Sequence, residues 1–187
     1  MSLKVIEIFY SIQGEGFHSG EPMVFVRTAG CNMACAFCDT DFTVRRRLSA
    51  REIAAEVLRL SPVDCNVRRV CITGGEPTIH DLDELLRLLD DAGMVVHMES
   101  NGSGPRPGRV GWFTVSPKRM DDLVVDSCDE LKVVLGAVDP EEAAQRVFSR
   151  VRYIQPMSED FAPALEWVLG HPWWRLSIQA HKVVGAR

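Results

Sequence analysis

Apolar, β-branched runs recur along the chain and predict eight strands. Most runs are nearly continuous rather than alternating, which is typical of parallel strands that are buried on both faces. The predicted strands span residues 3–9, 23–28, 69–73, 94–99, 112–116, 130–135, 151–155 and 175–179.

Four of the connections carry helix signals. The first begins at Ser49, which forms a capping-box pattern with Glu52. The others show leucines at helical spacing, an Asp-Pro start or a continuous apolar stretch. These three predicted helices lie at 80–93, from Asp139 onward and at 161–169.

Two connections, residues 101–111 and 117–129, have no helical period. Strands that alternate with helices favour βα units and a parallel sheet. Because two crossovers lack a helix, we expect an α/β fold with fewer helices than strands, a truncated and open (β/α) barrel. No linker or internal repeat interrupts the chain, so residues 1–187 are predicted to form a single domain.

Six predicted strands end in polar or glycine-rich clusters. In parallel α/β barrels the active site lies at the carboxyl ends of the strands. We therefore expect these clusters to form one mouth. They are the cysteine-rich segment from residue 31, GGEP (74–77), ESNG (99–102), SPK (116–118), QPM (155–157) and QAHK (179–182).

Composition narrows the class of protein. The 187 residues are 46% hydrophobic and 25% charged, ordinary values for a globular protein. The net charge of −5 argues against a nucleic-acid partner. The N-terminal sequence does not read as a secretory signal, and no apolar run is long enough for a membrane span. These features predict a cytoplasmic protein, in which clustered thiols point to metal or redox chemistry.

Three cysteines, Cys31, Cys35 and Cys38, have C-x3-C-x2-C spacing. Structural zinc takes four protein ligands, and iron–sulfur clusters of the 4Fe-4S type are usually held by four thiolates. Three ligands would leave one iron without a cysteine, and an open coordination site is typical of catalysis. A zinc adaptor or a non-enzymatic iron–sulfur carrier are the alternatives that the spacing leaves open.

The cysteine spacing, with Phe37 before the last cysteine, resembles the radical S-adenosylmethionine (SAM) superfamily. The segment Gly74 to Pro77 matches the GGE motif of that superfamily. The resemblance implies that SAM chelates the fourth iron and is split to a 5′-deoxyadenosyl radical. It also implies that Glu76 contacts the methionine ammonium, a role that a carboxylate suits.

Further motifs resemble the 7-carboxy-7-deazaguanine synthase family over almost the whole chain. They are SIQGEG, FVRTAGCN, CDTDF, TGGEP, ESNG, SPK, ELK, QPM and the terminal QxHK. The resemblance implies a carbon–nitrogen lyase that contracts the ring of 6-carboxy-5,6,7,8-tetrahydropterin to 7-carboxy-7-deazaguanine with loss of ammonia. The resemblance places this reaction in the biosynthesis of queuosine and other 7-deazapurines, a pathway of tRNA modification, and leaves open whether the product enters tRNA or a secondary metabolite. An activating enzyme that makes a radical on a partner protein is the nearest alternative.

The resemblance implies three sets of site residues and the cofactors 4Fe-4S, SAM and Mg²⁺. The metal ligands are Cys31, Cys35 and Cys38 for the cluster and Thr40 for Mg²⁺. The SAM-binding residues are Phe37, Asp39, Gly75, Glu76, Ser100, Ser116, Pro117, Lys118, Gln155, Pro156, Met157 and Ser158. The substrate-binding residues are Ile12, Gln13, Gly14, Glu15, Arg27, Thr73, His181 and Arg187.

The partners implied are a small pterin substrate and a flavodoxin or ferredoxin reductant. A homodimer is expected at the family level. Direct contacts with nucleic acid or a membrane are not expected.

Overall fold

The structure, a computed structural model, describes residues 2–38, 41–62, 68–158 and 160–186. Two compact units can be distinguished in the chain. Unit 1 comprises residues 1–11, 22–100 and 106–113, and unit 2 comprises residues 12–21, 101–105 and 114–187. The expectation of a single domain stays a prediction.

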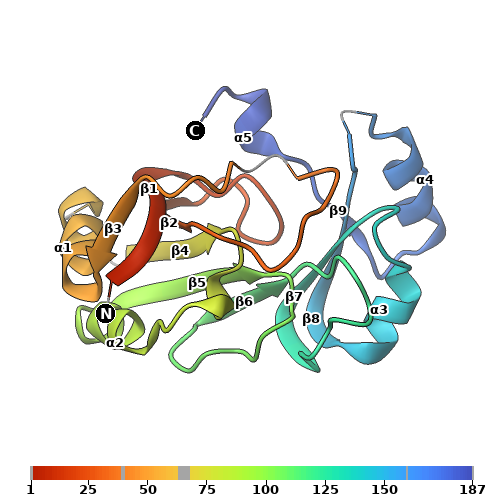
Figure 1. Cartoon of the computed structure of the whole chain (residues 1–187). Helices are drawn as coiled ribbons and strands as arrows, with labels where there is room; N and C mark the ends of the chain where they lie inside the picture. The colour runs from red at the N-terminus through yellow and green to blue at the C-terminus, as the bar shows by residue number, and fades with distance from the viewer. Residues whose placement is uncertain (1, 39–40, 63–67, 159, 187) are drawn as a thin grey trace. The chain divides into compact units, whose positions relative to one another are not determined.

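Unit 1 is built on five strands in the order β3-β1-β2-β4-β5. β2, β4 and β5 are parallel to one another, whereas β3 runs antiparallel to β1. The strands are β1 (Ser2–Ile12), β2 (Pro22–Thr28), β3 (Arg46–Ser49), β4 (Arg68–Gly74) and β5 (Met94–Ser100). Figure 1 shows them with the helices of this unit.

The helices of unit 1 are α1 (Ala50–Leu60), α2 (Asp83–Asp91) and the short 3-10 turn η1 (Pro77–Ile79). The capping box predicted for α1 is confirmed, because Ser49 and Glu52 bond reciprocally at its start. α1 and α2 pack against each other and against β2 and β5, respectively.

Both faces of the unit 1 sheet are apolar. One face carries a buried cluster of Phe9, Met23, Phe25 and Cys71, in which the rings of Phe9 and Phe25 stack 5.2 Å apart. Val24 and Ile72 are neighbours of these residues along the strands and so lie on the other face, where they are also fully buried. Burial on both faces explains why the strand sequences are continuous rather than alternating.

Unit 2 contains parallel strands in the order β6-β7-β8-β9. They are β6 (Trp112–Val115), of which the last two residues belong to unit 2, β7 (Ser127–Val134), β8 (Phe148–Gln155) and β9 (Arg175–Leu176). Its helices are α3 (Pro140–Arg146), α4 (Ala162–Gly170) and α5 (Ala180–Val183). α3 packs on β7 and β8, and α4 packs on β8 and β9. As predicted, Asp139 is the N-cap of α3, and its carboxylate accepts the Glu142 N–H at 2.8 Å.

All eight predicted strands are present, and the described residues contain more strands than α-helices. Besides the 3-10 turn η1, two elements are additions to the predicted ones. β3 has only four residues and no apolar alternation, and it forms because its backbone pairs with β1. α5 is one turn that follows β9, which is shorter than the predicted strand 175–179.

Within the parts of the chain that the structure describes, no helix is long and apolar enough to cross a membrane.

Candidate functional site

The three predicted cluster cysteines lie on the loop between β2 and β3. Cys31 and Cys35 are half-buried, and Cys38 is exposed. The N–H of Cys38 donates to the carbonyl of Cys35 at 3.1 Å, so the last two cysteines close a turn. Burial raises the pKa of the Cys31 thiol, and the nearby charges of Glu76, Cys35 and Cys38 raise it further. Binding to a metal cation would offset this cost of forming thiolates.

The turn after β4 lies directly on the start of the cysteine loop. The N–H of Gly75 donates to the carbonyl of Thr28, and the N–H of Glu76 donates to the carbonyl of Gly30, both at 2.9 Å. A Cβ on Gly75 would lie 1.8 Å from the oxygen of Gly30. Only glycine allows this approach, so the GGE motif and the segment before Cys31 form one backbone unit.

Glu76 is fully buried at the centre of this turn. Its Oε1 accepts hydrogen bonds from the N–H of Thr78 at 3.0 Å and from the Thr78 hydroxyl at 2.7 Å. The hydroxyl of Ser100, at the end of β5, donates to the same oxygen at 2.8 Å. Three donors therefore hold one side of a buried carboxylate next to the cysteine loop, which suits a ligand that carries an ammonium group.

The donor set fits a cluster with one open iron. Three reduced thiols lie on one loop, beside a buried carboxylate and a close-packed glycine turn. Among the described residues, no three His, Cys, Asp or Glu side chains are grouped closely enough to hold a single metal ion. Cys31, Cys35 and Cys38 are the residues that would hold the cluster. Phe37, which precedes Cys38, is half-buried on the same loop.

The unit 1 sheet carries charged and polar side chains near the carboxyl ends of β2, β4 and β5. Arg27 on β2 pairs in register with Thr73 on β4, and the Thr73 hydroxyl donates to Glu99 on β5 at 3.0 Å. The Nε of Arg27 lies 3.2 Å from the Oε1 of Glu7. Its guanidinium carbon is 5.6 Å from the centre of the Phe9 ring. This face therefore holds an oriented arginine on β2. Beside it, Thr73 on β4 carries a hydroxyl group that is bonded to the Glu99 carboxylate.

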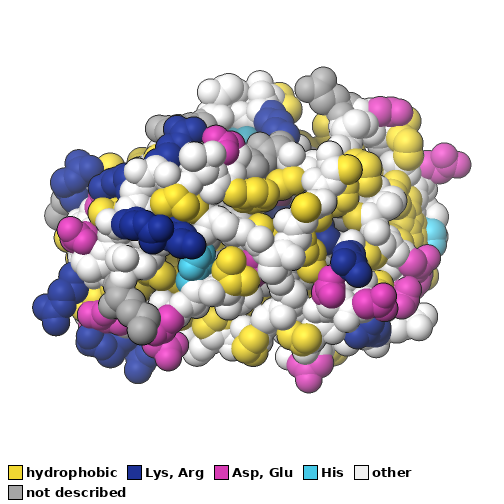
Figure 2. Space-filling view, viewed as in Figure 1, with side chains coloured by type: hydrophobic (Ala, Val, Ile, Leu, Met, Phe, Trp, Pro, Cys, Tyr) yellow, Lys and Arg dark blue, Asp and Glu magenta, His cyan; other side chains and the backbone are white. Residues whose placement is uncertain are grey.

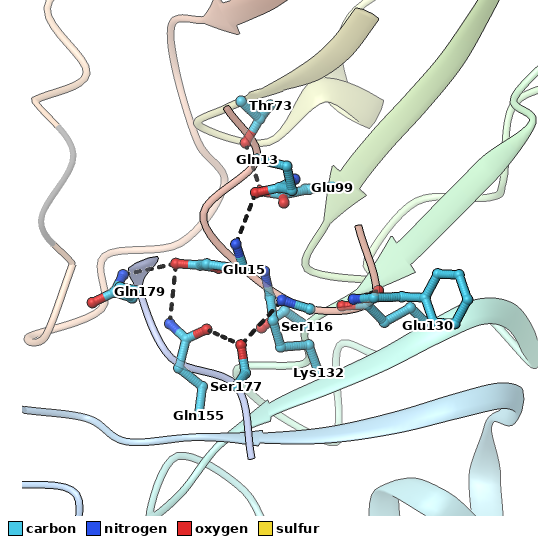
Figure 3. Close-up of polar contacts among 12 residues, drawn as sticks. Gln13, Glu15, Thr73, Glu99, Ser116, Glu130, Lys132, Gln155, Ser177 and Gln179 are labelled. Atoms are coloured by element: carbon cyan, nitrogen blue, oxygen red, sulfur yellow. Dashed lines mark hydrogen bonds and ion pairs between the residues drawn. The ribbon is translucent and has the colours of Figure 1, made fainter. Parts of the chain in front are cut away.

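Unit 2 gathers a second polar group around Glu15, in the predicted substrate loop. The Oε1 of Glu15 accepts from the side-chain amide of Gln179 at 2.7 Å and, more weakly, from that of Gln155 at 3.4 Å. Its Oε2 forms an ion pair with the Nζ of Lys132. Figure 3 shows these side chains converging from β7, β8 and the segment after β9.

The Glu15 carboxylate is held in its charged form. Burial by itself would raise its pKa, but the charge of Lys132 and the hydrogen bonds from Lys132 and Gln179 lower the pKa to about 2. The positive potential of His181 acts in the same direction, and the His181 ring lies directly against Gly14. The predicted substrate residues of unit 2 that the structure describes, residues 12–15 and His181, therefore lie around one loop.

The remaining predicted SAM residues of unit 2 lie at the ends of β6 and β8. Pro117 is buried, and the Nζ of Lys118 donates to the carbonyl of Ser116 at 2.7 Å and to its hydroxyl at 2.5 Å. Pro156 is half-buried, whereas Met157 and Ser158 are exposed.

Three predicted site residues, Asp39, Thr40 and Arg187, lie outside the described residues. The magnesium ligand and the C-terminal contact stay predictions. That all six strand-end clusters share one mouth also stays a prediction, because they fall in both units.

These groups also contain several charged or polar side chains that were not predicted as site residues. Glu99 lies near the end of β5, in the ESNG motif, and Lys132 and Glu130 belong to ELK on β7. The sequence signal for Lys132 is a charged residue within an apolar strand, because lysine is seldom buried without a partner. The residues added by the structure are Glu7, Glu99, Glu130, Lys132, Ser177 and Gln179.

Replacing Gly75 by alanine is expected to weaken SAM binding at least about tenfold. The new methyl group must displace the Gly30 backbone, which leads into Cys31. SAM affinity, measured by equilibrium dialysis on anaerobically reconstituted protein, checks this result. The matched control is Gly108→Ala, because a Cβ there meets nothing within 4 Å. An affinity of Gly75→Ala equal to that of Gly108→Ala would contradict the expectation.

Comparisons with known proteins identify the family. Residues 25–153 match the family model of the radical SAM superfamily. The chain is 40% identical to the 7-carboxy-7-deazaguanine synthase of Bacteroides thetaiotaomicron, with both chains covered completely. It is 37% identical to the protein of that name from Bradyrhizobium diazoefficiens, again over both whole chains.

A solved structure, the crystal structure of QueE from Escherichia coli, is similar to the chain with a TM-score of 0.78 and 27% sequence identity. The match covers 97% of this chain and 95% of the other. The expected fold class, an α/β fold of the open radical SAM type, is confirmed by this likeness. On these grounds the chain belongs to the 7-carboxy-7-deazaguanine synthase family of the radical SAM superfamily.

Proposed function

We propose that the protein contracts the ring of 6-carboxy-5,6,7,8-tetrahydropterin to 7-carboxy-7-deazaguanine with release of ammonia. The observation that carries this proposal is the GGE turn, which is bonded to the start of the three-cysteine loop and buries Glu76 beside it. This half-site occurs in a chain whose full-length relatives carry the name of that enzyme. The reaction would place it in the formation of queuosine and related 7-deazapurines.

The radical SAM family implies a 4Fe-4S cluster and SAM as cofactors. When bound, the reduced cluster supplies the electron that cleaves SAM and starts radical chemistry. Cys31, Cys35 and Cys38 would hold the cluster, and Glu76 would bind the methionine ammonium. Ser100 fixes the direction of the Glu76 carboxylate by its hydrogen bond at 2.8 Å.

In unit 1, we assign the substrate carboxylate to Arg27. The Glu7 carboxylate and the Phe9 ring hold its guanidinium from one side. An arginine that is fixed in this way binds a planar carboxylate better than a free one, because less freedom is lost on binding. Thr73, bonded to Glu99, lies in register beside Arg27 and would bind a polar edge of the pterin.

In unit 2, the loop of Ile12 to Glu15 and the neighbouring His181 are assigned to the pterin edge. Gln13 and Gly14 are buried in this loop. Main-chain N–H and C=O groups there can form hydrogen bonds with the fixed pattern of donors and acceptors along the edge of the pterin. The SAM contacts assigned to this unit are those of Ser116 to Lys118 and of Gln155 to Ser158.

Magnesium is the third proposed cofactor. Mg²⁺ prefers oxygen ligands and keeps several waters or substrate oxygens. The Thr40 hydroxyl, together with the substrate carboxylate, would supply such oxygens, and Asp39 belongs to the same assigned segment. Removal of Mg²⁺ should raise the KM for the pterin more than it changes the affinity for SAM.

The partners are proposed at the family level. A flavodoxin or ferredoxin would deliver the electron, and two copies of the chain would form a homodimer. The cytoplasm is the proposed location, because its reducing conditions keep the cluster thiols available.

An anaerobic turnover assay tests the function. Reconstituted protein is incubated with SAM, Mg²⁺, a chemical reductant and 6-carboxy-5,6,7,8-tetrahydropterin, and products are identified by mass spectrometry. We expect 7-carboxy-7-deazaguanine, with SAM not consumed in proportion. Deoxyadenosine without any deazaguanine would point instead to an activating enzyme that acts on a partner protein.

A further inference from the structure

Lys132 is a buried lysine on β7 that the assigned cofactor and substrate contacts leave without a role. Its side chain is 6% exposed, and its Nζ bonds to Oε2 of Glu15, whose side chain is 14% exposed. Lysine is seldom buried in this way unless it is paired, because desolvation of an ammonium is costly. The pair joins the middle of a strand to the substrate loop, 117 residues earlier in the chain.

The Glu15 carboxylate is engaged on both oxygens. Lys132 binds Oε2, and the amides of Gln179 and Gln155 reach Oε1. Gln179 in turn accepts a hydrogen bond from the Nζ of Lys182 at 2.8 Å. The side chain of Glu15 therefore points into unit 2 and attaches its loop there (Figure 3).

Backbone contacts continue this attachment on both sides of Glu15. The N–H of Phe17 donates to Glu130 at 3.0 Å, and the N–H of Gly16 donates to the Ser177 hydroxyl at 3.2 Å. The carbonyl of Gly14 accepts from the N–H of Ala180 at 2.8 Å. Gly16 has a φ of +65°, and a Cβ there would lie 1.9 Å from the Glu130 carboxylate. The loop is thus held closely to β7, and its shape depends on that strand.

We propose that Lys132 is a positioning residue, which fixes the loop of residues 12–17 through Glu15 in the shape that binds the pterin. This inference rests on the proposed function, because it needs the loop to contact the substrate. The physical reason is preorganisation: a loop that is ordered before binding loses less conformational freedom when the substrate binds. Loss of this preorganisation should therefore change KM more than kcat.

The experiment compares Lys132→Met with the wild-type protein, each reconstituted with its cluster. We expect KM for 6-carboxy-5,6,7,8-tetrahydropterin to rise about 10- to 100-fold, with kcat much less affected. Iron content and the affinity for SAM should stay at the wild-type values. Lys132→Arg keeps the cation and should recover much of the loss. The matched control is Lys4→Met, which changes an exposed lysine on β1.

Hydrogen exchange gives a readout that does not depend on turnover. In Lys132→Met the amides of Glu15, Gly16 and Phe17, which donate to the side chains of Gln13, Ser177 and Glu130, respectively, should exchange faster. Amides of β2 and β4 should be unchanged, whereas loss of protection throughout both strands would mean a general structural role and would overturn the proposal.

A double variant separates anchoring from direct substrate contact. Lys132→Met leaves the buried Glu15 charge unpaired, and Glu15→Gln removes that charge. If Lys132 acts through Glu15, the double variant should have a KM no higher than that of Lys132→Met. Additive increases in KM would show that the carboxylate contacts the substrate independently and would overturn the proposal.

Failure of this inference and failure of the proposed function look different. If the function is wrong, the wild-type protein makes no deazaguanine, and unchanged exchange in Lys132→Met would then reject the anchoring as well. If only the inference is wrong, the wild-type protein is active, and Lys132→Met has the same KM and the same hydrogen-exchange pattern as the wild-type protein.

Discussion

Replacing Cys35 by serine is expected to abolish formation of both deoxyadenosine and 7-carboxy-7-deazaguanine. A serine hydroxyl is a much poorer iron ligand than a thiolate, and the loop offers only Cys31 and Cys38 besides. With two cysteines left, the cluster should not survive purification. Iron and sulfide content, the visible absorption of the cluster and electron paramagnetic resonance after reduction check this outcome.

The matched control for this variant is Cys71→Ala. Cys71 is fully buried in the core with Phe9, Met23 and Phe25, away from the cysteine loop in the sequence. Its replacement should reduce the free energy of unfolding by about 1–2 kcal/mol while iron content stays the same. Equal loss of iron in both variants would show that instability, rather than ligation, explains the effect of Cys35→Ser.

Replacing Glu76 by glutamine is expected to weaken SAM binding by about 10- to 150-fold. Glutamine has nearly the same shape, and its carbonyl oxygen can still accept the bonds from Thr78 and Ser100. What is lost is the negative charge opposite the methionine ammonium. Hydrogen bonds to charged groups contribute about 1.5–3 kcal/mol, which sets the expected range. Equilibrium dialysis with SAM measures it directly.

Thr78→Val is the control for Glu76→Gln. It keeps the size of the side chain and removes only the hydroxyl that donates to Glu76 at 2.7 Å. The Ser100 bond and the negative charge remain, so SAM affinity should fall by less than about tenfold. An affinity of Glu76→Gln that matched the wild-type value would remove Glu76 from the proposed SAM site.

Strands and helices were predictable where burial leaves a mark in the sequence. Runs such as residues 23–28 and 69–73 are continuous because both sheet faces are covered, and Ser49 with Glu52 marks a helix start by local hydrogen bonds alone. The sequence of β3 has no apolar run that would mark it as a strand. Its four residues are exposed or half-buried, and only the free backbone edge of β1 makes them a strand.

The candidate site was predictable to the extent that its motifs are contiguous. The three cysteines and the GGE segment identify the superfamily, since spacing along a loop determines which ligands reach one cluster. The sequence did not reveal that Gly75 and Glu76 bond to the carbonyls of Thr28 and Gly30. Such contacts join residues about 45 positions apart, and no local pattern encodes them.

The sequence by itself determined the cysteine triad, the GGE motif, the eight strands and the family resemblance, because each depends on local spacing or on burial of a whole segment. Only the tertiary structure decided that Glu15 is held by Lys132, Gln155 and Gln179 rather than left exposed on its loop. It likewise decided that Glu7 and Phe9 orient Arg27. The physical reason is that a charged side chain takes its partner from whichever strands the fold places beside it, and that choice is made by long-range pairing.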